Sequence, residues 1–391
     1  MSNFLNAAHE MKEELIHYRR FLHQIPEVGD NLPQTTRFVM EKLTEMNIEP
    51  EEICKGGITA VIGGRKGGKV ILLRADMDAL PMIEESGLAF SATNGCAHTC
   101  GHDIHTAMLL GAAKLLKQYE EELDGTVKLM FQPGEENMAG AAAMLHSGVL
   151  QNPKVDAAMA LHVFPGNMHV GMMYWGTGPI LASSDVFRIT VSGKGGHGAI
   201  PQNAIDPIHV AVHIYMALQE ILTREVDPQE PIVLTIGTLH AGDAPNVIPE
   251  TAVMTGSLRT FSKDVRVFVK TRLEEIAAGT AKTFRADCTV EYMGGLCPTV
   301  NDEALALEIR KYMNELGIQL LPFPRQMGSE DFALVAEAVP SVFLGIGAGG
   351  AEPYYHKGGS HNSKVIFNED VLPLGAAALS YSAYHWLKNH C

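Results

Sequence analysis

Three histidines and two cysteines lie in the ten residues from Cys96 to His105. A thiolate and an imidazole two residues apart, as in Cys100 and His102, can reach the same pair of divalent ions, and both are good ligands for borderline-soft metals. The segment is predicted to be a loop between a strand and a helix, at the edge where open α/β sheets bind ligands. The alternative is a loop whose polar side chains cap the backbone of the next helix.

Two adjacent carboxylates, Glu135 and Glu136, follow a buried strand that is predicted over 126–132. Neighbouring side chains at a strand end point in different directions. One of the two acids can therefore bind a metal while the other acts on a water molecule as general base. The alternative is a solvated acid pair that opens the next helix, where carboxylates suit the helix dipole.

Two further histidines are candidate ligands. His162 ends a strand predicted over 157–162, so it is the third strand-end position to present a metal-type side chain at this edge. His361 lies in a glycine-rich loop after the last predicted strand, where His356 is its rival. Composition does not decide between these two.

The elements that position these residues follow from the spacing of apolar side chains. Strands that alternate with helices predict an α/β domain with a mixed, mostly parallel sheet covered on both faces. The strand over 69–74 is apolar on both faces, so it is expected to be central. Helices are predicted over 4–24, 34–46, 106–119, 139–148, 303–316 and 371–390, with a short one after 331, and strands over 57–62, 69–74, 126–132, 157–162 and 341–346.

A different pattern separates the two parts of this domain. It reads strand, helix, strand, strand, helix, strand, which is the ferredoxin-like βαββαβ unit. Its elements are predicted over 185–192, 206–225, 232–239, 251–259, 263–283 and 286–292. We therefore expect a metal-binding catalytic domain over 1–182 and 296–391, with a lid or dimerisation domain inserted over 183–295.

Composition excludes several classes of protein. The net charge of −15 provides no basic field to hold phosphates, which argues against nucleic-acid binding. No apolar run approaches about 18 residues, so no membrane span is expected. The N-terminal segment lacks the apolar stretch of a signal peptide, and the six scattered cysteines are typical of reduced thiols. A cytoplasmic protein is expected.

The chain also carries a series of short motifs along its whole length. In order they are RRFLHQIPE, LRADMDALP, CGHDIH, QPGEE, LH before Phe-Pro, GKGGHGAIP, APNVIP, GSEDF and SHN. With this combination the chain resembles the dinuclear metal amidohydrolases that include hippurate hydrolases, auxin–amino acid conjugate hydrolases and N-acetyl amino acid deacetylases. These enzymes form a branch of the zinc aminoacylase and carboxypeptidase superfamily.

The resemblance implies two divalent ions per subunit. Zinc, manganese, cobalt and nickel all suit mixed sulfur, nitrogen and oxygen ligands. The implied ligands are Cys100, His102, Glu136, His162 and His361. Cys100 would bridge the ions, and Glu135 would be the general base and later the proton donor to the leaving nitrogen. The wider superfamily has a His-x-Asp motif where this chain has Asp76-Met77-Asp78, so His102 must supply the missing nitrogen. Asp78 is then expected to orient an imidazole.

For the inserted domain, the resemblance implies that His197 reaches a neighbouring subunit's active site and stabilises the oxyanion. It also implies that Asn246 and Arg259 bind the substrate carboxylate, which suits the fork of an arginine. The alternative for Arg259 is an ordinary exposed strand residue. Glu330 and Asp331 belong to the family motif GSEDF, but a helix-capping role fits them equally well. A homodimer or homotetramer through the lid domain is expected.

We therefore expect metal-dependent hydrolysis of N-acyl amino acids (N-acetyl, N-benzoyl or similar) to a carboxylic acid and a free amino acid. A dipeptidase or carboxypeptidase is the alternative from the same chemistry, and acceptance of a free amino group on the substrate would distinguish it. A non-catalytic binding protein would need a lost base, yet Glu135 is present. A thiol enzyme with Cys100 as nucleophile fails chemically if that thiolate binds metal.

Overall fold

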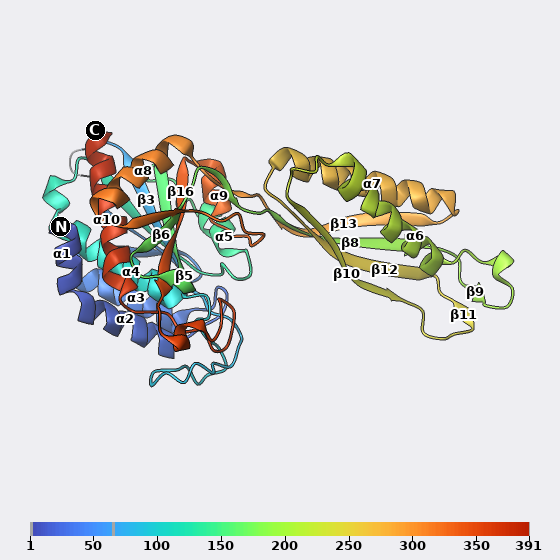
Figure 1. Cartoon of the computed structure of the whole chain (residues 1–391), viewed down its shortest axis with the longest axis horizontal. Coiled ribbons are helices and arrows are strands. Elements are labelled where there is room, and N and C mark those ends of the chain that lie inside the picture. The colour runs from blue at the N-terminus through green and yellow to red at the C-terminus, as the bar shows by residue number, and fades with distance from the viewer. Residues whose placement is uncertain (1–2, 65–66, 391) are drawn as a thin grey trace. The chain divides into compact units, whose positions relative to one another are not determined.

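The computed structural model describes residues 3–64 and 67–390. The described chain divides into two compact units (Figure 1). Residues 179–299 and 325–329 form the second unit, and the rest of the described chain forms the first. The assignment of these units as catalytic and lid domains, with boundaries at 182 and 296, stays a prediction.

An eight-stranded mixed sheet forms the centre of the first unit, in the order β1-β2-β4-β3-β5-β16-β6-β15. Strands β4, β3, β5 and β16 run parallel, and β15 is parallel to β6. The pairs β1–β2, β2–β4 and β16–β6 are antiparallel. The strands are β1 (Pro50–Cys54), β2 (Gly57–Gly63), β3 (Val70–Asp76), β4 (Thr126–Gln132), β5 (Ala157–His169), β6 (Met172–Trp175), β15 (Gln319–Pro322) and β16 (Ser341–Gly349). The predicted mixed, mostly parallel sheet is confirmed.

Helices complete the first unit. Among the first five of them, the helix that follows Gly101 is the most deeply buried. The helices are α1 (Asn3–Glu10), α2 (Lys12–Gln24), α3 (Pro33–Glu45), α4 (His102–Gln118), α5 (Gly140–His146), α8 (Glu303–Glu315), α9 (Ala333–Ala338) and α10 (Val371–Asn389), with 3₁₀ turns at Glu120–Glu122 and Pro353–His356. Helix α4 is buried on nearly all sides, as a core helix must be. Its Gly111 permits close packing, since a Cβ there would lie 2.7 Å from Leu15 and 3.0 Å from Ala376.

The second unit has a four-stranded antiparallel sheet in the order β10-β12-β8-β13, with α6 and α7 packed on it. In chain order the strands stand 2-3-1-4, so the predicted ferredoxin-like topology is confirmed. The elements are β8 (Ser184–Ser192), β9 (Gly196–His197), α6 (Pro207–Glu220), β10 (Ile232–Ala241), β11 (Val247–Ile248), β12 (Thr251–Thr260), α7 (Lys263–Thr283) and β13 (Asp287–Leu296). A 3₁₀ turn (Pro201–Asn203) and a π turn (Ile221–Glu225) flank α6, while β7 (Gly178–Leu181) and β14 (Thr299–Asn301) lie where the chain passes between the units.

Several element boundaries differ from the sequence-based prediction. The helix predicted over 4–24 is two helices that meet at Met11. The helix predicted from 106 begins at His102, because the left-handed backbone of Gly101 ends the preceding loop there. The strand predicted over 157–162 continues to His169. Within residues 3–64 and 67–390, no helix combines the length and hydropathy needed to cross a bilayer.

Candidate metal centre

The predicted site residues of the first unit lie at the carboxyl edge of its parallel strands. Asp76 ends β3, Glu135 and Glu136 follow β4, and His162 lies in β5. Because carboxyl ends of neighbouring parallel strands meet at one edge, three separate segments deliver polar side chains to the same place. The first turn of α4 begins at this edge and adds Cys100 and His102 to them.

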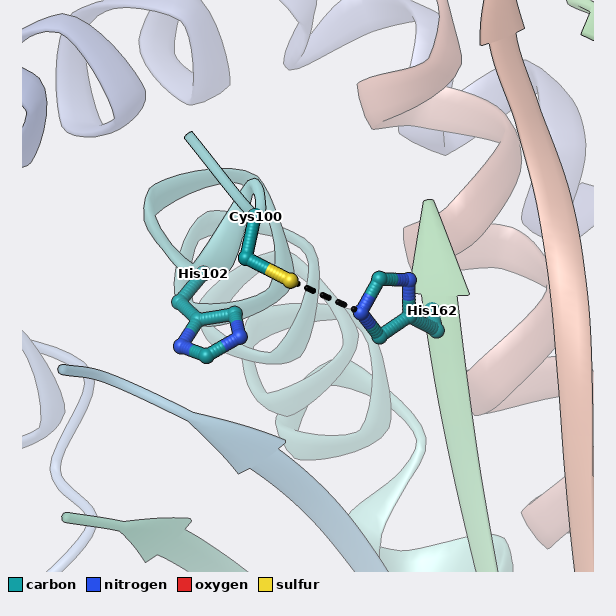
Figure 2. Close-up of side chains that lie close together, drawn as sticks. All are labelled: Cys100, His102 and His162. Carbon is teal, nitrogen blue, oxygen red and sulfur yellow. Dashed lines mark hydrogen bonds between the residues drawn. The ribbon is translucent and has the colours of Figure 1, made fainter. Parts of the chain in front are cut away.

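All five predicted ligands come together at this edge. Figure 2 shows the side chains of Cys100, His102 and His162 gathered between the start of α4 and β5, with Cys100 Sγ 3.4 Å from His162 Nε2. Glu136 Oε1 lies 3.2 Å from His361 Nε2 and 4.0 Å from His102 Nε2. Two groups of three have their ligand atoms within 4.8 Å of one another: Cys100, His102 and His162, and Cys100, Glu136 and His361. Cys100 belongs to both groups.

The structure also distinguishes between the two histidines of the glycine-rich loop. His361, rather than His356, has its imidazole within reach of Cys100 and Glu136. Its backbone N–H donates to the Thr99 carbonyl at 2.9 Å, which joins this loop to the segment before Cys100. His361 has a positive φ of 63° and lies partly exposed at the mouth of the cluster.

The backbone around Gly101 lets two neighbouring ligands face the same space. Gly101 has φ +90°, a left-handed conformation that side-chain-bearing residues rarely adopt. A Cβ at this position would lie only 2.4 Å from Val163 Cγ2. The glycine therefore allows α4 to start directly against β5, with Cys100 before the turn and His102 after it.

Hydrogen bonds fix the orientation of the His162 imidazole. Its Nδ1 lies 2.9 Å from the Val163 carbonyl oxygen, which can only accept, so Nδ1 carries the proton. The unprotonated Nε2 then faces Cys100. Burial and the neighbouring His105 hold the pKa of His162 well below its ordinary value. The ring is therefore neutral, which is the form that binds metals.

The residues present fit a divalent cation. His102 is fully buried, and among the described residues neither of its ring nitrogens has a hydrogen-bond partner of good geometry, nor does Glu136 Oε1. Although burial opposes protonation, Asp76 and Cys100 raise the pKa of His102 well above its ordinary value. The acidic groups around His102 thus favour positive charge at this position. The sulfur, nitrogen and oxygen donors together suit borderline metals.

Burial also governs the thiol and the two adjacent acids. It raises the pKa of the Cys100 thiol to about 12, so a nearby cation is needed to keep it as a thiolate. Burial and Glu330 raise the pKa of Glu135 well above its ordinary value. Although burial works against it, contact with His361 lowers the pKa of Glu136. The two neighbours thus differ, since Glu136 favours the charged form and Glu135 holds a proton more readily.

Sequence reasoning missed a buried network beneath this cluster. Arg74, in the middle of β3, donates to Asp76 Oδ2 at 2.8 Å and to Glu330 Oε1 at 2.9 Å. Asp331 accepts from Gln132 Nε2 at 2.7 Å and from the Ala141 N–H at 2.9 Å. Glu330 and Asp331 therefore do more than cap a helix. The available signal was an arginine inside an apolar strand, because such a charge is rarely buried without a partner.

Three predicted site residues lie in the second unit. The backbone segments of His197 and Asn246 pair through β9 and β11, where Gly198 N–H donates to the Asn246 carbonyl at 2.8 Å. Both residues line one hollow of about 1010 Å³. Arg259 Nη1 donates to the Met327 carbonyl at 2.9 Å and to Ser329 Oγ at 3.0 Å. No ion pair joins Arg259 to a carboxylate within the described part of the chain.

A mixed α/β sheet with thiol, imidazole and carboxylate groups at its carboxyl edge defines the class of this protein as a metal-binding α/β protein. The model of peptidase family M20/M25/M40 matches residues 72–385. The chain belongs to this family.

Known proteins similar to this chain include two curated relatives and a solved structure. An N-acetyl-L-cysteine deacetylase of Bacillus subtilis is 39% identical over 91% of this chain and 85% of its own length. A thermostable carboxypeptidase of Saccharolobus solfataricus is 37% identical over 95% of each chain. The crystal structure of a dinuclear metal-binding M20 peptidase from Bacillus subtilis matches with a TM-score of 0.85 and 34% identity, over 97% of this chain and 99% of that one.

Proposed function

We propose that this chain hydrolyses the amide bond of N-acyl amino acids and releases a carboxylic acid and a free amino acid. The observation that carries the proposal is the meeting of Cys100, His102, Glu136, His162 and His361 with Glu135 beside them. The similarity to an N-acetyl-L-cysteine deacetylase supports this substrate class. The cluster contains enough donors for two ions, and the similarity to a dinuclear metal-binding peptidase supports that number.

Each predicted ligand has a distinct place in this arrangement. Cys100 would contribute its thiolate to both ions, because its sulfur belongs to both groups of three donors. His102 and His162 supply nitrogens on the side of α4 and β5, and Glu136 and His361 supply donors at the mouth. Two bound divalent ions would polarise the amide carbonyl and lower the pKa of a water molecule to near neutrality. Zinc, manganese, cobalt and nickel all suit these donors.

Glu135 handles the proton. Its carboxylate is not needed as a ligand, and one of its oxygens lies within 4.8 Å of donor atoms of His102 and Glu136. It accepts the proton of the attacking water and returns it to the departing nitrogen. Glu135 is 9% exposed, so little bulk water competes for this proton. Burial and Glu330 raise its pKa, which favours its holding the transferred proton before that proton is returned.

The second unit supplies substrate-binding groups. His197 Nδ1 accepts a hydrogen bond from the Ala199 N–H at 3.0 Å, so in the neutral ring the proton lies on Nε2. That N–H is a suitable donor to the oxyanion of a neighbouring subunit. Arg259 has no protein carboxylate as its partner within the described residues, which leaves its charge for the substrate carboxylate. Asn246 lies beside His197, beyond the other end of β12, so like His197 it would assist from a neighbouring subunit.

A homodimer or homotetramer through the second unit follows from the proposed role of His197. The outer face of α6 supports it, because Val212, Tyr215 and Met216 are 48%, 43% and 62% exposed. No disulfide joins the described cysteines, which supports the predicted cytoplasmic location.

The test is hydrolysis of N-acetyl, N-benzoyl and longer N-acyl amino acids before and after chelation, with Glu135→Gln as the inactive control. Turnover that chelator abolishes and added metal restores is expected. Full turnover by the variant or by the chelated enzyme would sink the proposal. The similarity to a carboxypeptidase favours a second candidate, hydrolysis of small peptides. Faster cleavage of dipeptides with a free amino group than of their N-acetylated forms would select it.

A thiol mechanism is tested by alkylation of Cys100. If the thiolate binds metal, iodoacetamide labels Cys100 only after chelation, and a substrate analogue does not protect the metal-free protein. Protection by substrate in the metal-free protein would instead indicate a nucleophilic cysteine.

A further inference from the structure

His105 ends the CGHDIH motif, yet none of the roles described above uses it. It lies in the first turns of α4, is 1% exposed, and its ring centroid is 4.6 Å from that of His162. One of its nitrogens, one nitrogen of His102 and one oxygen of Asp76 form a further group of potential ligands that lie within 4.8 Å of one another. Its hydrogen bonds decide whether it binds a metal or does something else.

Both nitrogens of His105 are already bonded to the protein. Nε2 lies 2.9 Å from the backbone nitrogen of Val163, which can only donate, so Nε2 is unprotonated. The proton is therefore on Nδ1, which donates to Asp76 Oδ1 at 2.5 Å. No lone pair remains on the ring for a cation. Arg74 donates to the other oxygen of Asp76 at 2.8 Å, so this group already has its positive charge.

The hydrogen bond from Val163 takes the place of a backbone hydrogen bond that β3 does not provide. Strand β3 pairs with β5 only as far as Arg74 and Ala160. Beyond this point the two strands separate, and Val163 N–H has no backbone acceptor from β3. His105 supplies the acceptor from α4 instead. The peptide of Val163 is thereby held at the position where its strand would otherwise lose support on that side.

Val163 also orients the His162 imidazole, because the Val163 carbonyl accepts from His162 Nδ1 at 2.9 Å. We propose that His105 is a positioning residue, which holds the Val163 backbone and so aims His162 Nε2 at the metal centre, while Arg74 and Asp76 hold His105. This inference rests on the proposed metal-binding function.

The two hydrogen bonds of His105, to Asp76 and to Val163, form a tether between α4 and the sheet. Two substitutions separate its halves. In His105→Gln the side-chain oxygen can take the place of Nε2 and accept from Val163 N–H. In His105→Asn the shorter amide can take the place of Nδ1 and donate to Asp76, but it does not reach Val163. The proposal therefore requires that glutamine preserve metal binding and that asparagine impair it. Thr59→Val is the matched control, because it removes another buried hydrogen bond of this sheet, to the Leu129 carbonyl at 3.0 Å.

The experiment is a titration of the metal-free proteins with Co²⁺, followed by the thiolate–cobalt absorption band, with thermal unfolding of each metal-free variant. His105→Asn and His105→Ala are expected to bind Co²⁺ about 10- to 100-fold more weakly and to alter the band, which is the usual effect of losing such a supporting group. His105→Gln and Thr59→Val should keep the wild-type affinity, whatever their thermal stability.

Wild-type affinity in His105→Ala, or equal losses in the asparagine and glutamine variants, would overturn the inference while leaving the proposed function intact. A wild-type protein that takes up no Co²⁺ would instead overturn the proposed function. If His105→Asn does not fold, Asp76→Leu tests the tether from its other end. It removes the acceptor of His105 Nδ1 and is expected to weaken Co²⁺ binding in the same range, and wild-type affinity there would again contradict the inference.

Discussion

Asp78 Oδ1 accepts a hydrogen bond from the backbone N–H of Glu135 at 3.0 Å. The other oxygen accepts from the N–H of Glu136 at 3.2 Å, and Oδ1 also lies 3.4 Å from His102 Nδ1. One buried carboxylate thus sets the backbone of both adjacent acids and faces a histidine. The proposed base and two of the proposed ligands therefore have a common support, which extends the orienting role predicted for Asp78.

Substitution of Asp78 by asparagine tests this support. An amide offers an acceptor on only one atom, so one of the two N–H groups would face an NH₂ group. We expect metal affinity or kcat to fall about 10- to 100-fold, measured by metal titration and by hydrolysis of an N-acetyl amino acid. Asp156→Asn is the control, because Asp156 also accepts a backbone N–H, that of Val70 at 2.9 Å, but at the opposite end of β3.

Glu135→Gln should separate catalysis from metal binding. Loss of a general base lowers kcat by about 10²- to 10⁴-fold, while the metal content stays at the wild-type value because the ligands remain. Glu136→Gln, one residue away, should lose metal as well as activity. Equal metal loss in the two variants, measured by elemental analysis of the purified proteins, would contradict the division of roles between them.

Chelation should lower thermal stability. A ligand that binds only the folded chain adds about 2.7 kcal/mol when its concentration is 100 times Kd. The melting temperature measured by calorimetry should therefore fall on chelation and recover when metal is returned. The melting temperature of Cys100→Ser should fall less on chelation, because a hydroxyl is a poorer donor to borderline metals than a thiolate. An unchanged melting temperature in the chelated wild type would argue against the centre.

Arg259→Ala should weaken binding of the substrate carboxylate. Hydrogen bonds to charged groups contribute about 1.5–3 kcal/mol, which corresponds to roughly a 10- to 150-fold loss in kcat/KM. The loss should be confined to substrates with a carboxylate and be absent for their carboxamides, as measured by steady-state kinetics on both. Arg188→Ala is the control, an exposed arginine of β8 in the same sheet. Equal losses on both substrates would indicate a structural role.

Stability in acid should depend on Glu84. Although burial opposes ionisation, hydrogen bonds from His23, Ser86 and the Ala92 N–H lower its pKa from 4.5 to about 2. A carboxyl group whose pKa is lower in the folded chain stabilises it above the unfolded pKa and loses that effect as pH falls. As the pH falls from 4.5 to 2, the free energy of unfolding of the wild type should decrease by on the order of 2 kcal/mol more than that of Glu84→Gln, after allowance for solvent screening. Parallel urea-unfolding curves for the two proteins across this range would contradict it.

The patterns that predicted the fold were those with long-range regularity. Alternating helices and strands predicted the mixed sheet, and the βαββαβ order predicted the second unit's topology, because both depend on many residues at once. Short elements gave no such signal. Strands β6 and β15 have four residues each and only partly buried faces, so neither shows a clear period. The break at Met11 has no glycine or proline to announce it.

The site was predictable where ligand-type residues follow strand ends in the sequence. Residue types alone left His361 and His356 equal, and only the folded loop separates them, because Thr99 anchors His361 through its backbone. The hydrogen-bond network that links Arg74 to His105 could not be predicted from the sequence, for a different reason. It joins residues 31 positions apart through the gap between two strands, and no local pattern encodes the point at which strands separate.

The left-handed turn at Gly101 limits how this enzyme can diversify. Every replacement there would collide with β5, and each neighbour is a proposed ligand, so the segment offers no freedom for adapting to new substrates. Laboratory evolution toward other acyl groups should therefore accumulate its changes elsewhere, such as in the 239–251 stretch that surrounds His197. Libraries that randomise residues 99–103 should yield almost only inactive clones.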